Sequence, residues 1–282
     1  MQRPGWAPAA IDLERPSVAR MYDYFLGGSH NFAVDREAAH QILAIMPDVP
    51  LRAQANRAFL RRAVRYLLGA GVRQFLDIGS GIPTVGNVHE VAQQAAPDSR
   101  VVYVDVDPVA VAHSQELLAG DDRSAVIQED LRRPDRILTH PVVRELLDLR
   151  EPVAVLLVAV LHFVPDADAP HAAVAAIRDA LAPGSYLALS HANVTAIDAG
   201  DLAAGQRVYD RSDGSFFSRP TGEVARFFDG FTLVEPGLVW VPRWRPDPGS
   251  NTTGAEQAIM LGGVARLGDV GSGPGGTGQP GG

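Results

Sequence analysis

Three carboxylates each follow an apolar, strand-like run of this chain, and each could accept hydrogen bonds from a ligand. Asp77 stands two residues before a Gly79-Ser80-Gly81 turn, Asp105 lies near the end of the second run, and Asp130 follows the third. Open α/β sheets bind their ligands at the carboxyl ends of the strands. We therefore expect the three acids to lie at one edge of a sheet and to share a ligand there.

The residues around the glycine turn indicate which kind of nucleotide-like ligand it binds. Taken alone, Gly79-Ser80-Gly81 fits NAD, ATP or S-adenosylmethionine, because glycine lets the main chain approach a ligand closely. A dinucleotide-binding turn would carry a third glycine where this chain has Thr84, and would start its helix where Pro83 stands. An acid before the turn suits a cationic amino-acid group better than an anionic pyrophosphate. The turn therefore favours S-adenosylmethionine over NAD.

The other two acids could bind the rest of such a molecule. Asp105 could accept hydrogen bonds from both hydroxyls of a ribose, provided that the strand alternates with Val104 and Val106 buried. Asp130 could accept a hydrogen bond from the amino group of adenine, while Leu131 covers the ring.

Composition excludes several classes of chemistry. The 282 residues include no cysteine and no lysine, since all 25 basic residues are arginine. This removes disulfides, thiolate metal sites, a Walker A loop and lysine Schiff bases. His89-Glu90 lacks the second histidine of a zinc motif, so we expect no metal. The net charge of −8 argues against broad nucleic-acid binding.

The chain carries no sequence signal for a membrane or for export. Its longest apolar run, residues 153–164, is too short to cross a bilayer. The N-terminus has no apolar core of the secretory type. We therefore expect a cytoplasmic protein that acts away from membranes, and the sequence leaves its oligomeric state open.

The three acids need a sheet to position them, and the pattern of the chain predicts one. Strands are expected at 74–78, 101–106, 125–128, 153–160 and 186–190, alternating with helices, and then near 231–234, 238–241 and 258–266. Helices near 17–26, 35–45 and 51–68 come first, and a helical stretch spans 194–212. The expected organisation is a flexible arm (1–16), an N-terminal helical cap (17–71), an α/β core (72–266) and a disordered Gly-rich tail (267–282).

Polar and aromatic side chains crowd around Gly27-Gly28 in the helical cap. They are Tyr22, Tyr24, Asn31 and Asp35. Two interpretations stay open for them. They either close a helix–loop–helix that packs on the sheet, or they form a lid whose groups reach the ligand.

Three arginines recur every four residues on the third helix, at Arg57, Arg61 and Arg65. Like charges at this spacing lie on one helix face and repel one another mildly. The pattern indicates either a solvated face that pairs with acids elsewhere or an anion-binding site.

Two histidines, His162 and His191, follow the fourth and fifth strands on the ligand side. Each could serve as an acid–base group, or could simply pack in the core or lie in a loop. Phe216, Phe217 and Trp244 could line an apolar substrate pocket, although packing in the core is the simpler explanation.

Taken in order, these motifs resemble those of the class I S-adenosylmethionine-dependent methyltransferases. The matching residues are Asp77 to Gly81, Asp105, Asp130-Leu131, Leu161 to Phe163 and Leu181 to Gly184. Residues 19–28, with Asn31 and Asp35, are similar to the N-terminal signature of a methyltransferase family first catalogued as a domain of unknown function, and residues 82–90 and 227–246 match it too. The likeness covers about residues 16–266.

The resemblance implies a doubly wound, mostly parallel, seven-stranded Rossmann-like methyltransferase sheet with an N-terminal helical cap. It also implies S-adenosyl-L-methionine as the cofactor. The residues implied to bind it are Asp77, Gly79 and Gly81 at the methionine end, Asp105 at the ribose and Asp130 with Leu131 at the adenine, joined by Tyr22 and Asn31 if the cap is a lid.

The implied reaction is direct SN2 transfer of a methyl group to a small molecule. A sulfonium methyl is already activated, so the enzyme mainly aligns the reactants and excludes water. A base is needed only if the acceptor must lose a proton early, and His162 and His191 are the candidates. The fourth strand starts Pro152-Val153-Ala154 without the acid common in the superfamily, which leaves fewer polar groups near the methyl. The alternatives are a regulatory or degenerate S-adenosylmethionine-binding protein without turnover and, less favoured, an NAD-dependent oxidoreductase.

The variant Asp105→Ala tests the ribose assignment. Loss of a charged hydrogen-bond partner should weaken the binding of S-adenosylmethionine by about 2–3 kcal/mol, with the fold retained. Calorimetric titration measures the affinity, and circular dichroism checks the fold. Unchanged affinity would mean that the ribose acid was misassigned.

Overall fold

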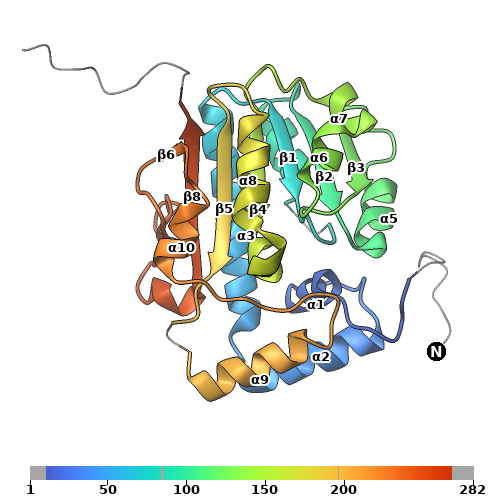
Figure 1. Cartoon of the computed structure of the whole chain (residues 1–282), viewed down its shortest axis with the longest axis vertical. Helices are drawn as coiled ribbons and strands as arrows, with labels where there is room; N and C mark the ends of the chain where they lie inside the picture. The colour runs from blue at the N-terminus through green and yellow to red at the C-terminus, as the bar shows by residue number, and fades with distance from the viewer. Residues whose placement is uncertain (1–10, 84–85, 196, 269–282) are drawn as a thin grey trace, which may run out of the picture.

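A mostly parallel sheet organises the residues that the computed structural model describes, 11–83, 86–195 and 197–268 (Figure 1). Its strands are β1 (Gln74–Ile78), β2 (Arg100–Asp105), β3 (Ser124–Gln128), β4 (Ala154–Val158), β5 (Tyr186–Ala192), β6 (Phe231–Leu233), β7 (Val239–Trp240) and β8 (Met260–Leu267). The order across the sheet is β3-β2-β1-β4-β5-β8-β6, and β7 pairs with β8 off this path.

Strands β1 to β5 run parallel, and β8 is antiparallel to β5. Strand β4 is apolar throughout because it lies between β1 and β5 and is covered on both faces. The predicted doubly wound, mostly parallel sheet is therefore confirmed, and the two-residue β7 is an addition to its seven strands.

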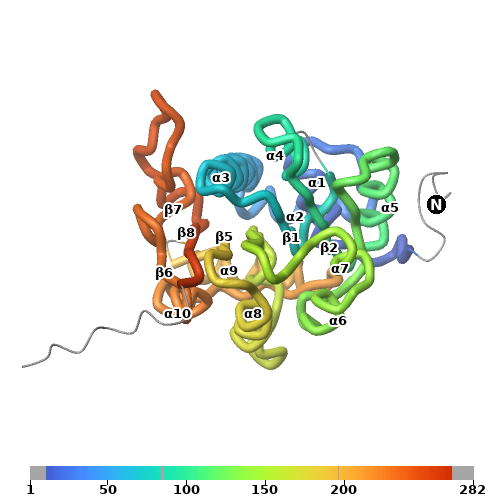
Figure 2. The backbone as a smooth tube through the Cα atoms, turned by 90° about the horizontal axis from the view of Figure 1, so that it is seen from above, coloured from blue at the N-terminus to red at the C-terminus, as the bar shows by residue number. Residues whose placement is uncertain are grey.

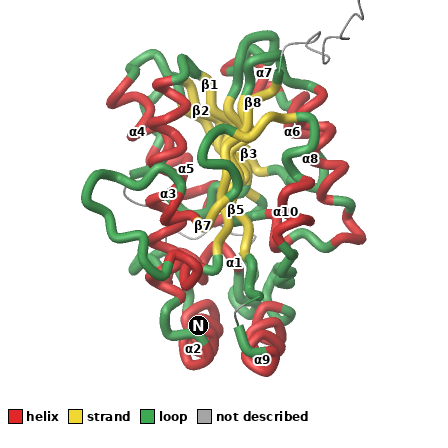
Figure 3. Tube along the Cα trace, turned by 90° about the vertical axis from the view of Figure 1, so that its left-hand side faces the viewer, coloured by secondary structure: helices red, strands yellow, loops and turns green. Residues whose placement is uncertain are grey.

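Helices cover both faces of the sheet (Figures 2 and 3). On one face lie α3 (Val49–Gly69), α4 (Val88–Ala95) and α5 (Pro108–Leu117), and on the other α6 (Pro134–Thr139), α7 (Pro141–Leu146), α8 (Pro170–Asp179) and α10 (Thr221–Arg226). Because side chains alternate along a strand, Phe75 packs with the α3 side and Leu76 with the α8 side. By the same alternation, Asp77 points to the side of α3.

The carboxyl ends of the parallel strands are covered by helices from two distant parts of the chain (Figure 1). These are α1 (Val18–Phe25), α2 (Ala33–Ile45) and α9 (Ala199–Tyr209). Helices α2 and α9 lie side by side below the sheet (Figure 3). Four short 3₁₀ turns complete the described elements: η1 (Leu161–Phe163), η2 (Asp166–Asp168), η3 (Val241–Arg243) and η4 (Ala255–Ala258). Most of the predicted arm (1–16) and tail (267–282) lies outside the described residues.

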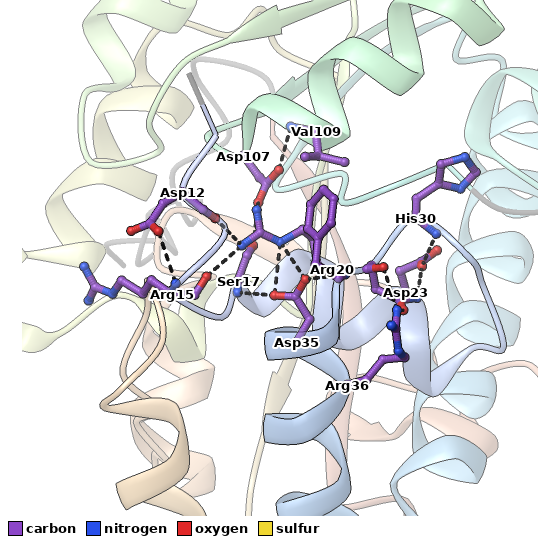
Figure 4. Close-up of polar contacts among 12 residues, drawn as sticks. Asp12, Arg15, Ser17, Arg20, Asp23, His30, Asp35, Arg36, Asp107 and Val109 are labelled. Atoms are coloured by element: carbon purple, nitrogen blue, oxygen red, sulfur yellow. Dashed lines mark hydrogen bonds and ion pairs between the residues drawn. The ribbon is translucent and has the colours of Figure 1, made fainter. Parts of the chain in front are cut away.

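A buried ion cluster fastens the N-terminal helices to the sheet (Figure 4). The Arg20 guanidinium lies 3.0 Å from the Asp35 carboxylate and 3.6 Å from that of Asp107. Asp35 also accepts hydrogen bonds from the backbone N–H groups of Ser17 and Phe32, at 2.9 and 2.8 Å. Such pairing and hydrogen bonding is what lets charges remain buried.

Asp107 links this cluster to the start of α5. Its Oδ1 accepts hydrogen bonds from the backbone N–H groups of Val109 and Ala110, which caps the helix. Its Oδ2 accepts a 2.5 Å hydrogen bond from the Ser17 hydroxyl. Ser17 precedes α1 as expected, but its hydroxyl binds Asp107 instead of capping its own helix. The position of α1 is therefore tied to the turn that follows β2.

The variant Arg20→Met should destabilise the fold strongly. It leaves two buried carboxylates without their cation, and breaking a buried pair in this way typically costs about 3–5 kcal/mol. Chemical denaturation measures the free energy of unfolding. The matched control is Arg65→Met, because the Arg65 side chain is 51% exposed and pairs with Asp247, whose side chain is 58% exposed, so its loss should cost less than about 1 kcal/mol. Equal losses in the two variants would contradict the structural role of the cluster.

Candidate functional site

A cavity of about 410 Å³ lies between α1 and the carboxyl ends of β1, β2 and β4, and we call it the large cavity. Its position at the carboxyl edge of a doubly wound sheet is the usual one for a ligand site. Seven of the residues singled out from the sequence line it: Tyr22, Asp77, Gly79, Gly81, Asp105, Asp130 and Leu131.

Asp77 is buried at the wall of the large cavity, with 4% of its surface exposed. No group among the described residues donates a hydrogen bond to its carboxylate. Burial raises the pKa of Asp77 to about 7, with Arg57 opposing the shift and Asp105 adding to it. An unpartnered buried carboxylate that faces a cavity is suited to bind a cation.

The glycine turn next to Asp77 has a backbone that requires glycine. The φ angles are +74° at Gly79 and +67° at Gly81. A Cβ atom on Gly79 would lie 2.4 Å from the side chain of Val160. The expected strand 153–160 ends at Val158 because Ala159 takes a φ of +61°, which turns Val160 over the glycine turn. The turn is therefore held between two strand ends.

Asp105 uses both of its carboxylate oxygens in hydrogen bonds to the backbone. Oδ2 accepts from Gly81 N–H at 2.7 Å, and Oδ1 accepts from Asp107 N–H at 2.9 Å. Burial raises the pKa of Asp105 to about 6, although these two hydrogen bonds oppose the shift. Asp105 therefore also positions the glycine turn, and Asp105→Ala would loosen that turn as well as remove an acceptor.

The expectation that Val106 is buried is wrong. Val104 is fully buried, whereas Val106 is 57% exposed and lines the large cavity. Strand β2 ends at Asp105, so the alternation of the strand no longer applies to the next residue. Val106 instead presents an apolar surface beside Asp105.

Asp130 and Leu131 lie at the β3 side of the large cavity. The Asp130 carboxylate is already paired, since it accepts hydrogen bonds from Nε and NH2 of Arg132 at 2.8 and 2.5 Å. Burial alone would raise the pKa of Asp130, but the Arg132 contacts lower it. Leu131 is buried in the hydrophobic core. Asp130 thus differs from Asp77, which has no such partner among the described residues.

Arg57 and Ser80 also line the large cavity, and the sequence did not single them out as its ligands. The Arg57 Nε and the Ser80 Oγ are buried and have no hydrogen-bond partner among the described residues. The sequence did carry a signal for Arg57, because the spacing of the arginines on α3 allowed an anion-binding site as one of two interpretations. Arg65 agrees with the other interpretation, a solvated face that pairs with acids, because it forms an ion pair with Asp247 at the surface. The cavity therefore holds an unpaired acid and an arginine with an unused donor.

Tyr22 and Asn31, which would both bind the ligand if the cap were a lid, have different surroundings in the structure. Tyr22 lines the large cavity, and its hydroxyl donates to Ala53 O and accepts from Asn56 Nδ2, at 3.2 and 3.1 Å. Asn31 lines no described cavity. Its amide donates to the Asp23 carboxylate and to Gly28 O, at 2.8 and 3.0 Å, which braces the Gly27-Gly28 turn. Asn31 therefore braces this turn and does not line the large cavity.

A second cavity of about 100 Å³, which we call the small cavity, adjoins the large one on the side of β5 and β8. The two cavities share a junction formed by Val18, Tyr22, Asn56, Ala159 and Phe163. Phe216 lines the small cavity, in agreement with the interpretation that it lines an apolar pocket. Trp244 is fully buried against Phe59 and Tyr66, so it packs in the core.

The two candidate histidines have different surroundings. His162 lines the small cavity, and its Nδ1 accepts a 3.3 Å hydrogen bond from Ala192 N–H. Burial, together with the nearby His191 and Arg219, holds the pKa of His162 well below its usual value, so the ring is neutral and carries its proton on Nε2.

His191 lines neither cavity and has no ring nitrogen free for a substrate. Its Nδ1 donates to Ala192 O at 2.7 Å, and its Nε2 accepts from Arg219 NH1 at 3.0 Å. We therefore do not propose His191 as a catalytic residue.

No group of three or more His, Cys, Asp or Glu side chains that could hold a metal ion occurs within residues 11–83, 86–195 and 197–268. No helix in the described part of the chain is long and apolar enough to span a membrane.

Comparison with known proteins assigns a family to this arrangement. Residues 4–268 match the model of a family described as S-adenosyl methyltransferase. A crystal structure of a Thermobifida fusca protein assigned as a methyltransferase is 40% identical, with a TM-score of 0.87, and the alignment covers 94% of this chain and 100% of that one. A DUF574 family protein from Streptomyces avermitilis is also 40% identical, with a TM-score of 0.84 and coverage of 90% and 98%.

More distant likeness shows the fold alone. An O-methyltransferase family protein from Burkholderia thailandensis is 13% identical, with a TM-score of 0.51 over 91% of this chain and 65% of that one. No curated protein matches the chain.

The variant Asp77→Asn should stabilise the ligand-free protein at pH 8. The raised pKa means that the folded state binds the Asp77 proton more tightly than the unfolded state, so stability falls as pH rises from about 4 to about 7. Asparagine removes this cost, so the melting temperature at pH 8 should rise by at least about 2 °C, with little change near pH 4. Calorimetric melting at the two pH values measures the effect. A lower melting temperature at pH 8 would contradict an unpartnered, buried Asp77.

Proposed function

We propose that this chain, which belongs to the S-adenosyl methyltransferase family, transfers the methyl group of S-adenosylmethionine directly to a small-molecule acceptor. The observation that carries the proposal is the pair of unlike charges on the large cavity, Asp77 and Arg57, next to a second, apolar cavity. S-adenosylmethionine is the cofactor of the family, and its amino-acid end carries both an ammonium and a carboxylate.

The unused polar groups of the large cavity fit this cofactor. Asp77 would accept hydrogen bonds from the ammonium, since its carboxylate has no other donor among the described residues. The buried Nε of Arg57 and Oγ of Ser80, which lack partners, would donate to the carboxylate. The open space beside Gly81 would let the backbone approach the ligand.

The nucleoside would lie toward β2 and β3. Asp105 would bind the ribose hydroxyls while it holds Gly81, and Asp130 would accept from the adenine amino group. Val106 and Leu131 supply the apolar surface for the adenine ring. In this arrangement the methionine end lies beside the junction with the small cavity, where the acceptor would enter.

The bound cofactor supplies a methyl group on a positively charged sulfur. What the chain contributes is orientation and exclusion of water. Helices α1 and α9 cover the carboxyl edge of the sheet, and Tyr22 and Phe163 narrow the junction. This covering by α1 and α9 favours a small acceptor, because a macromolecular chain would have to displace the two helices.

Label transfer tests the proposed function. The protein is incubated with methyl-labelled S-adenosylmethionine and a metabolite extract that has been filtered free of macromolecules. We expect label to appear in a low-mass product only with the native protein, and heat-denatured protein is the control. Label that moves only when protein or nucleic acid is restored to the extract would contradict a small-molecule acceptor.

The variant Arg57→Gln tests the assignment of the amino-acid end. It should weaken the binding of S-adenosylmethionine by about 1.5–3 kcal/mol, because a charged hydrogen bond to the carboxylate is lost. The binding of decarboxylated S-adenosylmethionine should not change, because it has no carboxylate. Calorimetry with both compounds measures the difference, with Arg65→Gln as the control for removing an arginine from the same helix. If the variant weakened the binding of both compounds equally, Arg57 would not be the residue that binds the carboxylate.

A further inference from the structure

We infer that the small cavity binds a hydroxylated aromatic carboxylate as the methyl acceptor, with Arg52 as the counter-ion of the carboxylate. This inference rests on the proposed function and deepens it, because it names the chemical class of the acceptor. It depends on three features of the small cavity: its walls, the unpaired arginine and the state of His162.

The walls of the small cavity are mostly apolar and rich in aromatic rings. Tyr209 and Phe216 lie with their ring centroids 5.6 Å apart and their planes 24° from parallel. Phe163 and His162 contact Phe216, with centroid distances of 6.0 and 5.4 Å. No Asp or Glu is among the residues that line the cavity. Such walls favour a flat aromatic ring.

Arg52 brings a positive charge to this apolar cavity without a matching acid. Among the described residues, its buried Nε has no hydrogen-bond partner, and its NH1 donates only to the sulfur of Met46, at 3.5 Å. No carboxylate of the described residues forms an ion pair with it. Burial lowers the pKa of Arg52, and Asp48 only partly offsets this through its charge. A planar carboxylate is the group that the arginine fork binds best.

The spacing along α3 is compatible with an acceptor of one or two rings. Arg52 lies one helical turn before Asn56, which belongs to the junction between the cavities. Four residues of an α-helix rise about 6 Å. This is about the distance between substituents on opposite sides of one or two fused rings. An acceptor anchored at Arg52 would therefore present its far end at the junction.

The state of His162 identifies the accepting atom as an oxygen. His162 carries its proton on Nε2, which forms no hydrogen bond within the described residues, so it can donate into the small cavity. A phenolic oxygen can accept this hydrogen bond with one lone pair and attack with another. A ring nitrogen has a single lone pair and would lose it to His162.

The transfer step then balances without a base from the chain. The phenol loses its proton to solvent, and the oxygen lone pair forms the new bond to the methyl carbon. The carbon–sulfur bond breaks, and its electron pair stays on sulfur, so the products are an aryl methyl ether and S-adenosylhomocysteine. His162 would be a positioning residue in this step, because it donates a hydrogen bond and moves no proton.

Binding of a matched pair of probes tests the inference. The probes are 6-hydroxy-2-naphthoate and its neutral analogue 6-hydroxy-2-naphthamide, titrated by calorimetry into the native protein with S-adenosylhomocysteine present. The naphthoate should bind at least about tenfold more tightly than the naphthamide, as expected for one charge-assisted contact. Arg52→Gln should remove this preference, Arg52→Lys should keep part of it, and Arg65→Gln, at an exposed site on the same helix, should leave it unchanged.

Three results would overturn the inference. Equal binding of the two probes, no binding of either, or a preference that survives in Arg52→Gln would each exclude Arg52 as the counter-ion. The proposed function would stand if S-adenosylhomocysteine still binds in those experiments. If S-adenosylhomocysteine itself does not bind the native protein, the proposed function fails together with the inference.

Discussion

The proposed site depends on the Asp77 carboxylate, which the fold buries without a hydrogen-bond donor among the described residues. Asp77 points from β1 toward α3, and burial raises its pKa to about 7. Such a group lowers the stability of the ligand-free protein at neutral pH, and a bound cation is what would remove the cost. The neighbouring features serve this arrangement. Asp105 holds the glycine turn open through Gly81, and α3 places Arg57 on the same cavity without pairing it to Asp77.

The cover over the carboxyl edge of the sheet is assembled from both halves of the chain. Arg20 connects α1 and α2 to the turn after β2 through Asp35 and Asp107, so the cap and the β2 side of the large cavity share one buried cluster. Helix α9, which follows β5, lies against α2 and closes the small cavity. Because α1 lines both cavities, a movement of α1 that opens the large cavity would also open the small one.

Local signals in the sequence were sufficient for the sheet and for most residues of the large cavity. Strand periodicity, the acid before Gly79 and the cap at Asp107 all act within a few residues, so they can be read without a structure. Which arginine of α3 reaches the cavity could not be read, because Arg57, Arg61 and Arg65 share one helix face and only their position along the helix relative to the strand ends distinguishes them. The surroundings of His191 could not be predicted either, because its Nε2 accepts a hydrogen bond from Arg219, which is distant in the sequence. The position of α9 depends on its packing against α2.

The role of Asp77 is tested most directly by the number of protons released when S-adenosylmethionine binds at pH 6. At that pH most of the Asp77 carboxyl is protonated in the free protein, because its pKa is raised to about 7. Binding of an ammonium requires the ionised form, so calorimetry in buffers of different ionisation enthalpy should show the release of about one proton. 5′-Methylthioadenosine, which lacks the amino-acid end, should release distinctly less. Equal release with both compounds, or none with S-adenosylmethionine, would contradict the assignment of Asp77 to the cationic end of the cofactor.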